Sequence, residues 1–182
     1  MSKVASQDAV VLIGHGAPAT DCPPEWIGEL MSLEWRRGGG GPHQHASAGR
    51  AAELDAKIRN WPRQASNDPY KVGVERLAEA VRSLLLNIPV GVAYNEFCRP
   101  SIAEAVASAI QQGATRLFVI PTMLTPGGIH SERDIPRALE ELRRTHPAVS
   151  ITYLWPFDLS QVASLFAAQI RQAISRPAAV SP

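Results

Sequence analysis

The chain has almost no net charge, few cysteines and no long apolar run, and each shortage excludes a class of protein. Lysine and arginine total 18 against 17 for aspartate and glutamate, a formal net charge of +1. Nucleic acid is therefore an unfavourable main partner, because proteins that bind it carry a broad basic field. No apolar run approaches the roughly 18 residues of a membrane span. Residues 1–8 do not resemble a signal peptide, so we expect a cytoplasmic protein without a membrane partner.

Cysteine is also scarce, and the two that occur, Cys22 and Cys98, exclude a disulfide framework or a structural zinc site. We expect both to be free thiols in a reducing compartment. The remaining composition, 45% hydrophobic and 19% charged, is ordinary for a folded core, and 182 residues fit one domain. We predict a single domain over residues 1–176 and a flexible tail over 177–182.

Strand-like and helical segments alternate along the chain. The aliphatic run at 10–13 is typical of a central strand buried on both faces. Alternation from residue 90 onward implies parallel strands with right-handed crossovers and helices on both faces. We predict an α/β fold, a three-layer α/β/α domain with a four-stranded parallel sheet. The expected strands are 10–13, 90–94, 117–120 and 151–154, and the expected helices are 24–37, 49–60, 69–86, 102–112, 135–145 and 159–174.

Local signals support these boundaries. Asn67-Asp68-Pro69 offers a helix N-cap followed by an N1 proline, and Ser101 with Glu104 has the spacing of a capping box. Glycines 38–41 predict a mobile loop inside the segment 35–71, which resembles an insertion. The helix after Pro69 is expected to pack through an apolar face formed by Leu77, Val81, Leu84 and Leu85.

Two histidines and one glutamate follow the ends of three predicted strands. His15 follows the first strand, Glu96 the second, and His130 the loop after the third. In an open parallel sheet the carboxyl ends of the strands face the ligand crevice, so these side chains are expected to converge. Two imidazoles and a carboxylate suit cobalt, nickel, iron or zinc and leave positions open for water or substrate. The pattern predicts an open, divalent metal site.

Each of these residues also has a structural interpretation. His15 is explained equally by a turn, Glu96 by an ion pair with Arg99, and His130 by capping of the helix that follows. His43 and His45 lie beside the glycine run, where we expect a solvated segment. The four tryptophans, Trp26, Trp35, Trp61 and Trp155, are expected to pack in the core or an interface.

Three motifs then occur in order on the predicted strands. They are Ile13-Gly-His-Gly16, Tyr94-Asn-Glu-Phe-Cys-Arg-Pro-Ser101 and Val119-Ile-Pro-Thr-Met-Leu-Thr-Pro-Gly-Gly-Ile-His130, the last ending in Asp134-Ile-Pro136. Together they resemble the sirohydrochlorin cobaltochelatase and ferrochelatase family of the CbiX and SirB type. The resemblance covers about residues 10–16 and nearly all of 90–157. The chain departs from the family pattern at residues 17–21 and in a longer 35–71 segment.

The resemblance implies a class II chelatase, a lyase that inserts Co²⁺, Fe²⁺ or Ni²⁺ into a tetrapyrrole without a nucleotide. It implies that His15, Glu96 and His130 are the metal-binding and catalytic residues. For the acidic tetrapyrrole we expect contacts from the loop Thr125, Pro126, Gly127 and Gly128 and from Arg99; Arg36, Arg37, Arg50 and Arg133 are further candidates, because guanidinium groups match carboxylates. One four-stranded unit supplies only part of a cleft, so we expect a homodimer.

Two other functions compete with the chelatase. A metal or tetrapyrrole carrier would keep both histidines and lack turnover, and the altered residues 17–21 motivate that alternative. A hydrolase or phosphatase using the Gly-His-Gly turn is the weakest hypothesis. The chain lacks the Gly-x-Ser-x-Gly motif, and no arginine precedes His15 to bind a phosphate.

Overall fold

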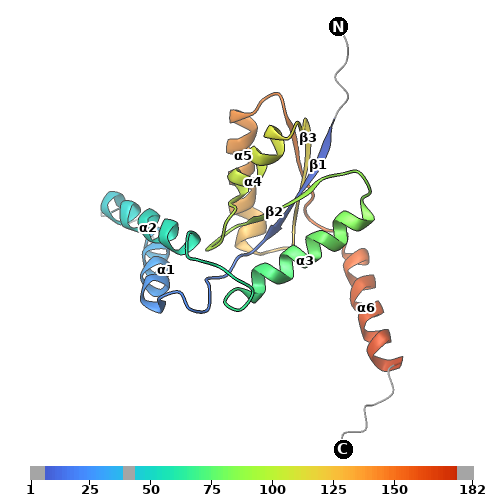
Figure 1. The fold of residues 1–182 in the computed structure, drawn as a ribbon, viewed down its shortest axis with the longest axis horizontal. Helices are drawn as coiled ribbons and strands as arrows, with labels where there is room; N and C mark the ends of the chain where they lie inside the picture. The colour runs from blue at the N-terminus through green and yellow to red at the C-terminus, as the bar shows by residue number, and fades with distance from the viewer. Residues whose placement is uncertain (1–6, 39–43, 176–182) are drawn as a thin grey trace, which may run out of the picture.

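A four-stranded parallel sheet organises the chain, with helices against both of its faces (Figure 1). The computed structural model describes residues 7–38 and 44–175. The predicted tail 177–182 and most of the glycine-rich loop therefore lie outside the described residues. In chain order the elements are β1 (Asp8–Gly14), α1 (Pro24–Gly38), α2 (Gln44–Arg59), α3 (Pro69–Leu84), β2 (Val90–Tyr94), α4 (Ile102–Gln111), β3 (Arg116–Pro121), the π-helical turn η1 (His130–Asp134), α5 (Ile135–Thr145), β4 (Ser150–Tyr153) and α6 (Leu159–Ser175).

The strand order β2-β1-β3-β4 confirms that the first strand is central. β1 pairs with β2 from Val10 opposite Val90 to Gly14 opposite Tyr94, and with β3 from Asp8 opposite Arg116 onward. All pairings are parallel, so the strands share one carboxyl edge. The sheet therefore brings the ends of β2, β1 and β3 next to one another.

Each face of the sheet has its own core. Alternate β1 residues Val11 and Ile13 point toward α4 and α5, where they pack with Val106 and Leu139. The other alternates of β1, Val10 and Leu12, pack with Val74 and Ala78 of α3 on the opposite face. β1 is buried without interruption from Ala9 to Gly14 while its side chains alternate between the two faces, as a three-layer arrangement requires. The predicted α/β class is confirmed.

Helices α1 and α2 form a separate pair beside the sheet (Figure 1). They enclose a third cluster that contains Leu30, Leu54 and Ile58, and Phe97 from the loop after β2 packs into it. α2 begins at Gln44, five residues earlier than predicted, because alanines 46, 48, 51 and 52 outweigh the unfavourable Gly49. The helix pair is joined to the sheet through the loop that carries Glu96.

The predicted apolar face of α3 is partly wrong. Leu77 is 47% exposed and Leu84 is 81% exposed, whereas Val74 and Ala78 are buried. Only one stripe of α3 contacts the sheet, and Leu77 and Leu84 lie on a neighbouring stripe. The helix also ends at Leu84, two residues before the predicted end, and Leu85 caps it by donating its N–H to the Val81 carbonyl. The predicted Asp68 cap is confirmed, because its carboxylate accepts a hydrogen bond from the Lys71 N–H.

Helix α6 extends away from the sheet (Figure 1). Among its described side chains only Val162 is buried. Leu159, Phe166 and Ile170, which lie on the same face as Val162, are exposed. No helix of the described residues is both long and apolar enough to cross a membrane.

Candidate metal-binding and catalytic site

The carboxyl edge of the sheet brings His15, Glu96 and His130 together. His15 follows β1, Glu96 follows β2, and His130 begins η1 after β3. One potential ligand atom from each side chain lies within 4.8 Å of the other two, and all three residues are partly buried. The convergence predicted from the three strand ends is therefore present in the structure.

The loops after β1 and β2 are held together by backbone hydrogen bonds. Their parallel pairing continues past the strand ends, because the Asn95 N–H donates to the Gly14 carbonyl and the Glu96 N–H donates to the His15 carbonyl, at 3.0 and 2.9 Å. Gly16 has a φ of +95°, and a Cβ at this position would lie 1.9 Å from the Glu96 carbonyl oxygen. Only glycine permits this approach.

The hydrogen bonds of His130 determine which ring nitrogen is free. Its Nδ1 lies 2.8 Å from Oδ2 of Asp134 and 2.9 Å from the amide nitrogen of Asn95. A carboxylate only accepts hydrogen bonds, whereas the Asn95 amide can turn its oxygen toward the ring, so we assign the proton to Nδ1. The lone pair of Nε2 is then available at 3.4 Å from Oε1 of Glu96. A carboxylate that orients a histidine in this way is typical of metal sites.

His15 is arranged in the same manner. Its Nδ1 lies 2.8 Å from the Gly16 carbonyl, which also can only accept, so Nε2 is again the free nitrogen. The backbone N–H of His15 donates to the hydroxyl of Tyr70, on α3, at 2.7 Å. The two imidazole rings meet edge to face with centroids 4.7 Å apart. Both rings are thus held by backbone or carboxylate acceptors and offer Nε2 as a ligand.

A cleft of about 1010 Å³ is lined by Glu96 and His130. Its wall contains four acids and the three arginines Arg59, Arg133 and Arg137, and Trp35 contributes an exposed indole. Guanidinium groups bind carboxylates through paired hydrogen bonds, so the wall suits a large acidic molecule. The cleft is lined by Leu30, Glu34, Trp35, Asp55, Arg59, Asn95, Glu96, Phe97, Ile129, His130, Arg133, Asp134 and Arg137.

Residues 65–173 match the model of the CbiX protein family. The chain belongs to the CbiX family. Among curated relatives, a sirohydrochlorin cobaltochelatase of Methanocaldococcus jannaschii is 44% identical over 79 residues, which are 43% of this chain and 54% of the relative. One from Priestia megaterium is 34% identical over 98 residues, covering 54% of this chain and 32% of the relative. The chain thus spans about half the length of the first relative and about a third of the length of the second.

Solved CbiX-family structures share the fold. A CbiX protein of Marinobacter aquaeolei VT8 superposes with a TM-score of 0.55 and 19% identity, covering 93% of this chain and 99% of that one. The sirohydrochlorin chelatase SirB of Bacillus subtilis subspecies spizizenii, solved in complex with cobalt, gives a TM-score of 0.50 and 16% identity over 91% of this chain and 50% of that one. The fold predicted from the sequence is therefore the CbiX fold.

The other predicted contact residues lie around the rim of the CbiX-family site or apart from it. Thr125, Pro126, Gly127 and Gly128 form an exposed loop directly before Ile129 of the cleft wall, and Glu132 accepts a hydrogen bond from the Gly127 N–H. Arg99 pairs with Glu104 and donates to Asn60 at 2.6 Å, and it is not among the cleft-lining residues. Its contact with substrate stays a prediction.

The remaining candidate arginines also differ in whether they line the cleft. Arg50 pairs with Glu29 and Glu53, whereas Arg133 lines the cleft beside Asp134. The side chains of Arg36 and Arg37, and residue His43, lie outside the described part of the chain. Glu96 faces His130, and Arg99 pairs with Glu104 instead, so the predicted alternative of a Glu96–Arg99 pair is wrong.

Several site residues were not predicted. Asp134 could have been found, because residues four apart on a helical turn face each other and His130 has that spacing from Asp134. Tyr70, Arg59 and Arg137 had no such signal, because they reach the site through tertiary packing alone.

Neither cysteine takes part in the site. Cys22 and Cys98 are free and buried, as predicted, and neither lines the cleft. Burial raises the pKa of both thiols. Their thiolates are therefore scarce, which leaves the imidazoles and the carboxylate as the candidate metal ligands.

Proposed function

We propose that this chain inserts a divalent metal, Co²⁺, Fe²⁺ or Ni²⁺, into sirohydrochlorin or a closely related tetrapyrrole without using a nucleotide. The observation that carries the proposal is the grouping of His15, Glu96 and His130 within 4.8 Å beside a cleft large enough for an organic ring system. Neutral imidazoles with one carboxylate suit these borderline cations. Chelatase names among the CbiX-family relatives support the same reaction.

The geometry assigns a task to each side chain. The two Nε2 atoms bind the incoming ion and replace part of its water shell, while their Nδ1 protons stay hydrogen-bonded to Gly16 and Asp134. Insertion exchanges two pyrrole N–H protons for the metal, so the site needs a proton acceptor close to the ion. Glu96, 3.4 Å from Nε2 of His130, is the acceptor that we propose for both protons in turn, and it releases the first to solvent before it takes the second. The ion is then passed to the ring nitrogens because imidazole binds it less tightly than thiolate would.

The cleft wall supports an acidic ring as the second substrate. Arg133 and Arg137 are the guanidinium groups on this wall that we propose to bind the carboxylate side chains of such a tetrapyrrole, whereas Arg59 already donates to Asp55 and to the carbonyls of the loop after β2. We propose that the Thr125–Gly128 loop and Arg99 contact the substrate from the rim. The direct support is strongest for the loop, because the next residue, Ile129, lines the cleft.

We further propose that two copies of the chain form a homodimer. The stripe of Leu159, Val162, Phe166 and Ile170 gives α6 an apolar face, of which only Val162 is buried within the chain. An amphipathic helix gains free energy by burying such a face, and a second copy would supply the cover. The two unpaired, buried thiols support the cytoplasm as the proposed location, because free cysteines persist in reducing compartments.

The reaction is tested by mixing purified protein with sirohydrochlorin and each metal ion and following the visible spectrum of the macrocycle. We expect insertion faster than the spontaneous rate, and we expect His130→Ala to reduce kcat by at least about tenfold, because it removes a ligand of the ion. His146→Ala is the matched control, because His146 caps the far end of α5 and does not line the cleft. A wild-type rate equal to the spontaneous one would contradict the proposal, and stoichiometric binding without acceleration would identify a carrier instead.

A further inference from the structure

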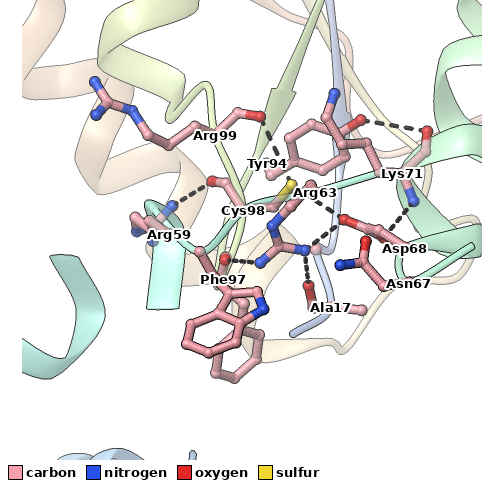
Figure 2. A network of polar contacts seen from close by, with 12 residues as sticks. Ala17, Arg59, Arg63, Asn67, Asp68, Lys71, Tyr94, Phe97, Cys98 and Arg99 are labelled. Carbon is pink, nitrogen blue, oxygen red and sulfur yellow. Dashed lines mark hydrogen bonds and ion pairs between the residues drawn. The ribbon is translucent and has the colours of Figure 1, made fainter. Parts of the chain in front are cut away.

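A buried arginine connects the two loops that carry His15 and Glu96. Arg63 lies between α2 and α3, and its side chain is 8% exposed. Its Nη1 donates to the carbonyl of Ala17 at 2.8 Å, and its Nη2 donates to the carbonyl of Phe97 (Figure 2). Ala17 lies two residues after His15, and Phe97 directly follows Glu96. A single guanidinium group thus holds both loops at fixed positions.

Arg59, the last residue of α2, holds the second loop from the other side. It donates to the carbonyls of Asn95 and Cys98, each at 2.9 Å. The Glu96 carbonyl between them accepts from the Cys98 N–H at 2.6 Å. Every backbone carbonyl from residue 95 to residue 98 therefore accepts a hydrogen bond. Phe97 has a φ of 55°, a backbone conformation that residues other than glycine rarely adopt. The unusual backbone at Phe97, directly after Glu96, is held from outside by two arginines.

The charge of Arg63 is balanced by Asp68, whose side chain is 2% exposed. Buried ion pairs often add no stability over apolar residues of similar volume, so stability alone does not explain the pair. The Nε of Arg63, moreover, is buried without a hydrogen-bond partner among the described residues. What the guanidinium provides is a rigid planar fork that reaches carbonyls of two loops at once, which a lysine cannot do.

We propose that Arg63, together with Arg59, is a positioning residue that sets the separation of His15 and Glu96 and thereby the affinity of the site for a divalent ion. The inference rests on the proposed function, because it requires that these side chains bind metal. Both arginines lie before residue 65, where the match to the CbiX family model begins. The 35–71 segment, expected from the sequence to be an insertion, thus contributes directly to the geometry of the site.

Two variants test the role of Arg63 without leaving a buried charge unpaired. Arg63→Met combined with Asp68→Asn removes the ion pair, and asparagine still caps α3. Arg63→Lys keeps the positive charge beside Asp68 but loses the fork. We expect both to weaken Co²⁺ binding by about tenfold or more, as loss of an outer-shell contact does at other metal sites. The Kd is measured by titration with Co²⁺ alone, well below the thermal unfolding temperature of each variant.

Amide hydrogen exchange provides a readout that does not require metal. The Glu96 N–H donates to His15 and the Cys98 N–H donates to Glu96, so both amides report on the loop. We expect them to exchange at least about tenfold faster in both Arg63 variants. Arg50→Met is the matched control, because Arg50, within α2, also has acidic partners, Glu29 and Glu53, and donates to neither loop. It should leave the Co²⁺ affinity and both exchange rates unchanged.

The outcomes separate this inference from the proposed function. If the wild-type chain binds no Co²⁺, the proposed function and this inference fail together. If the wild-type chain binds Co²⁺ and the Arg63 variants bind it equally well, only the positioning role is overturned, even if the variants unfold at a lower temperature. Weaker binding with faster exchange at Glu96 and Cys98 supports it.

Discussion

At the scale of single residues, the location of one proton decides what each imidazole offers to a metal. Gly16 and Asp134 accept hydrogen bonds from Nδ1 of His15 and His130, so Nε2 is the nitrogen that each neutral ring offers to a metal. The sequence placed both histidines at strand ends but gave no information on ring orientation. That property depends on a carbonyl and a carboxylate whose positions follow from the fold.

Asp134→Ala should therefore reduce metal affinity although Asp134 is not a proposed ligand. Without the carboxylate, His130 can rotate and protonate on either nitrogen, and we expect the Kd for Co²⁺ to rise roughly 10–100-fold. Glu140→Ala is the control, because Glu140 is an exposed acid farther along α5. Isothermal titration with Co²⁺ measures both, and equal affinities in the two variants would contradict the orienting role of Asp134.

The two thiols should resist alkylation in the folded protein. Burial raises the pKa of Cys22 and of Cys98, so at a given pH fewer thiolates are present than in the unfolded chain, and reagent access is blocked as well. We expect iodoacetamide at mildly alkaline pH to leave the native chain unmodified and to modify both cysteines in guanidinium chloride. Mass spectrometry counts the adducts, and rapid labelling of either cysteine in the native state would show that it is exposed.

At the scale of elements, the structural features that depend on local sequence signals were predicted well. The aliphatic run of β1 and the Ser101–Glu104 capping box each depend on neighbouring residues, and both are present. Features that depend on tertiary contacts were not predicted. The face of α3 that meets the sheet and the π-helical form of η1 are examples. Apolar spacing shows that a helix has a face but does not show which of two adjacent stripes is covered.

The loop between β1 and α1 gives a prediction at the scale of elements. Gly16→Ala should destabilise the chain by more than about 1 kcal/mol, because alanine is strained at this positive φ. Its Cβ would also displace the Glu96 loop, so metal binding should weaken in the folded protein. Urea unfolding measures the free energy of unfolding.

Gly73→Ala is the matched control. Gly73 lies within α3, and a Cβ there meets nothing within 4 Å. We expect this substitution to stabilise the chain by about 0.5–1 kcal/mol through helix propensity. If the two variants had the same stability, the close approach of Gly16 to Glu96 would not be a structural constraint.

At the scale of the whole molecule, helix α6 is the element whose apolar face stays largely exposed in the single chain. Its amphipathic pattern was evident from the sequence, but the pattern cannot show whether the partner surface belongs to the same chain. The same limit applies to the cleft, whose wall combines α1, α2 and α5 with the loop after β2. Such long-range combinations arise only when the fold is complete.

Replacement of Phe166 and Ile170 by aspartate should shift the protein from dimer to monomer. Two charges on the apolar stripe would be buried without partners in the dimer, which is costly, whereas both positions are exposed in the single chain. The control places aspartate at Ala168 and Gln172, which have the same spacing on the opposite face of α6. Analytical ultracentrifugation measures the mass in solution. A wild-type protein that is monomeric and fully active would contradict the proposed dimer.

The strand order fixes the size of the metal site. Glu96, His15 and His130 come from β2, β1 and β3, which are consecutive neighbours in the sheet. Neighbouring strands lie about 4.8 Å apart, so side chains delivered from adjacent strand ends are spaced on the scale of a metal's coordination sphere. Because β1 is central, the backbone hydrogen bonds of the sheet set the spacing of the three strands after which these side chains lie. This spacing in turn sets the dimensions of the site.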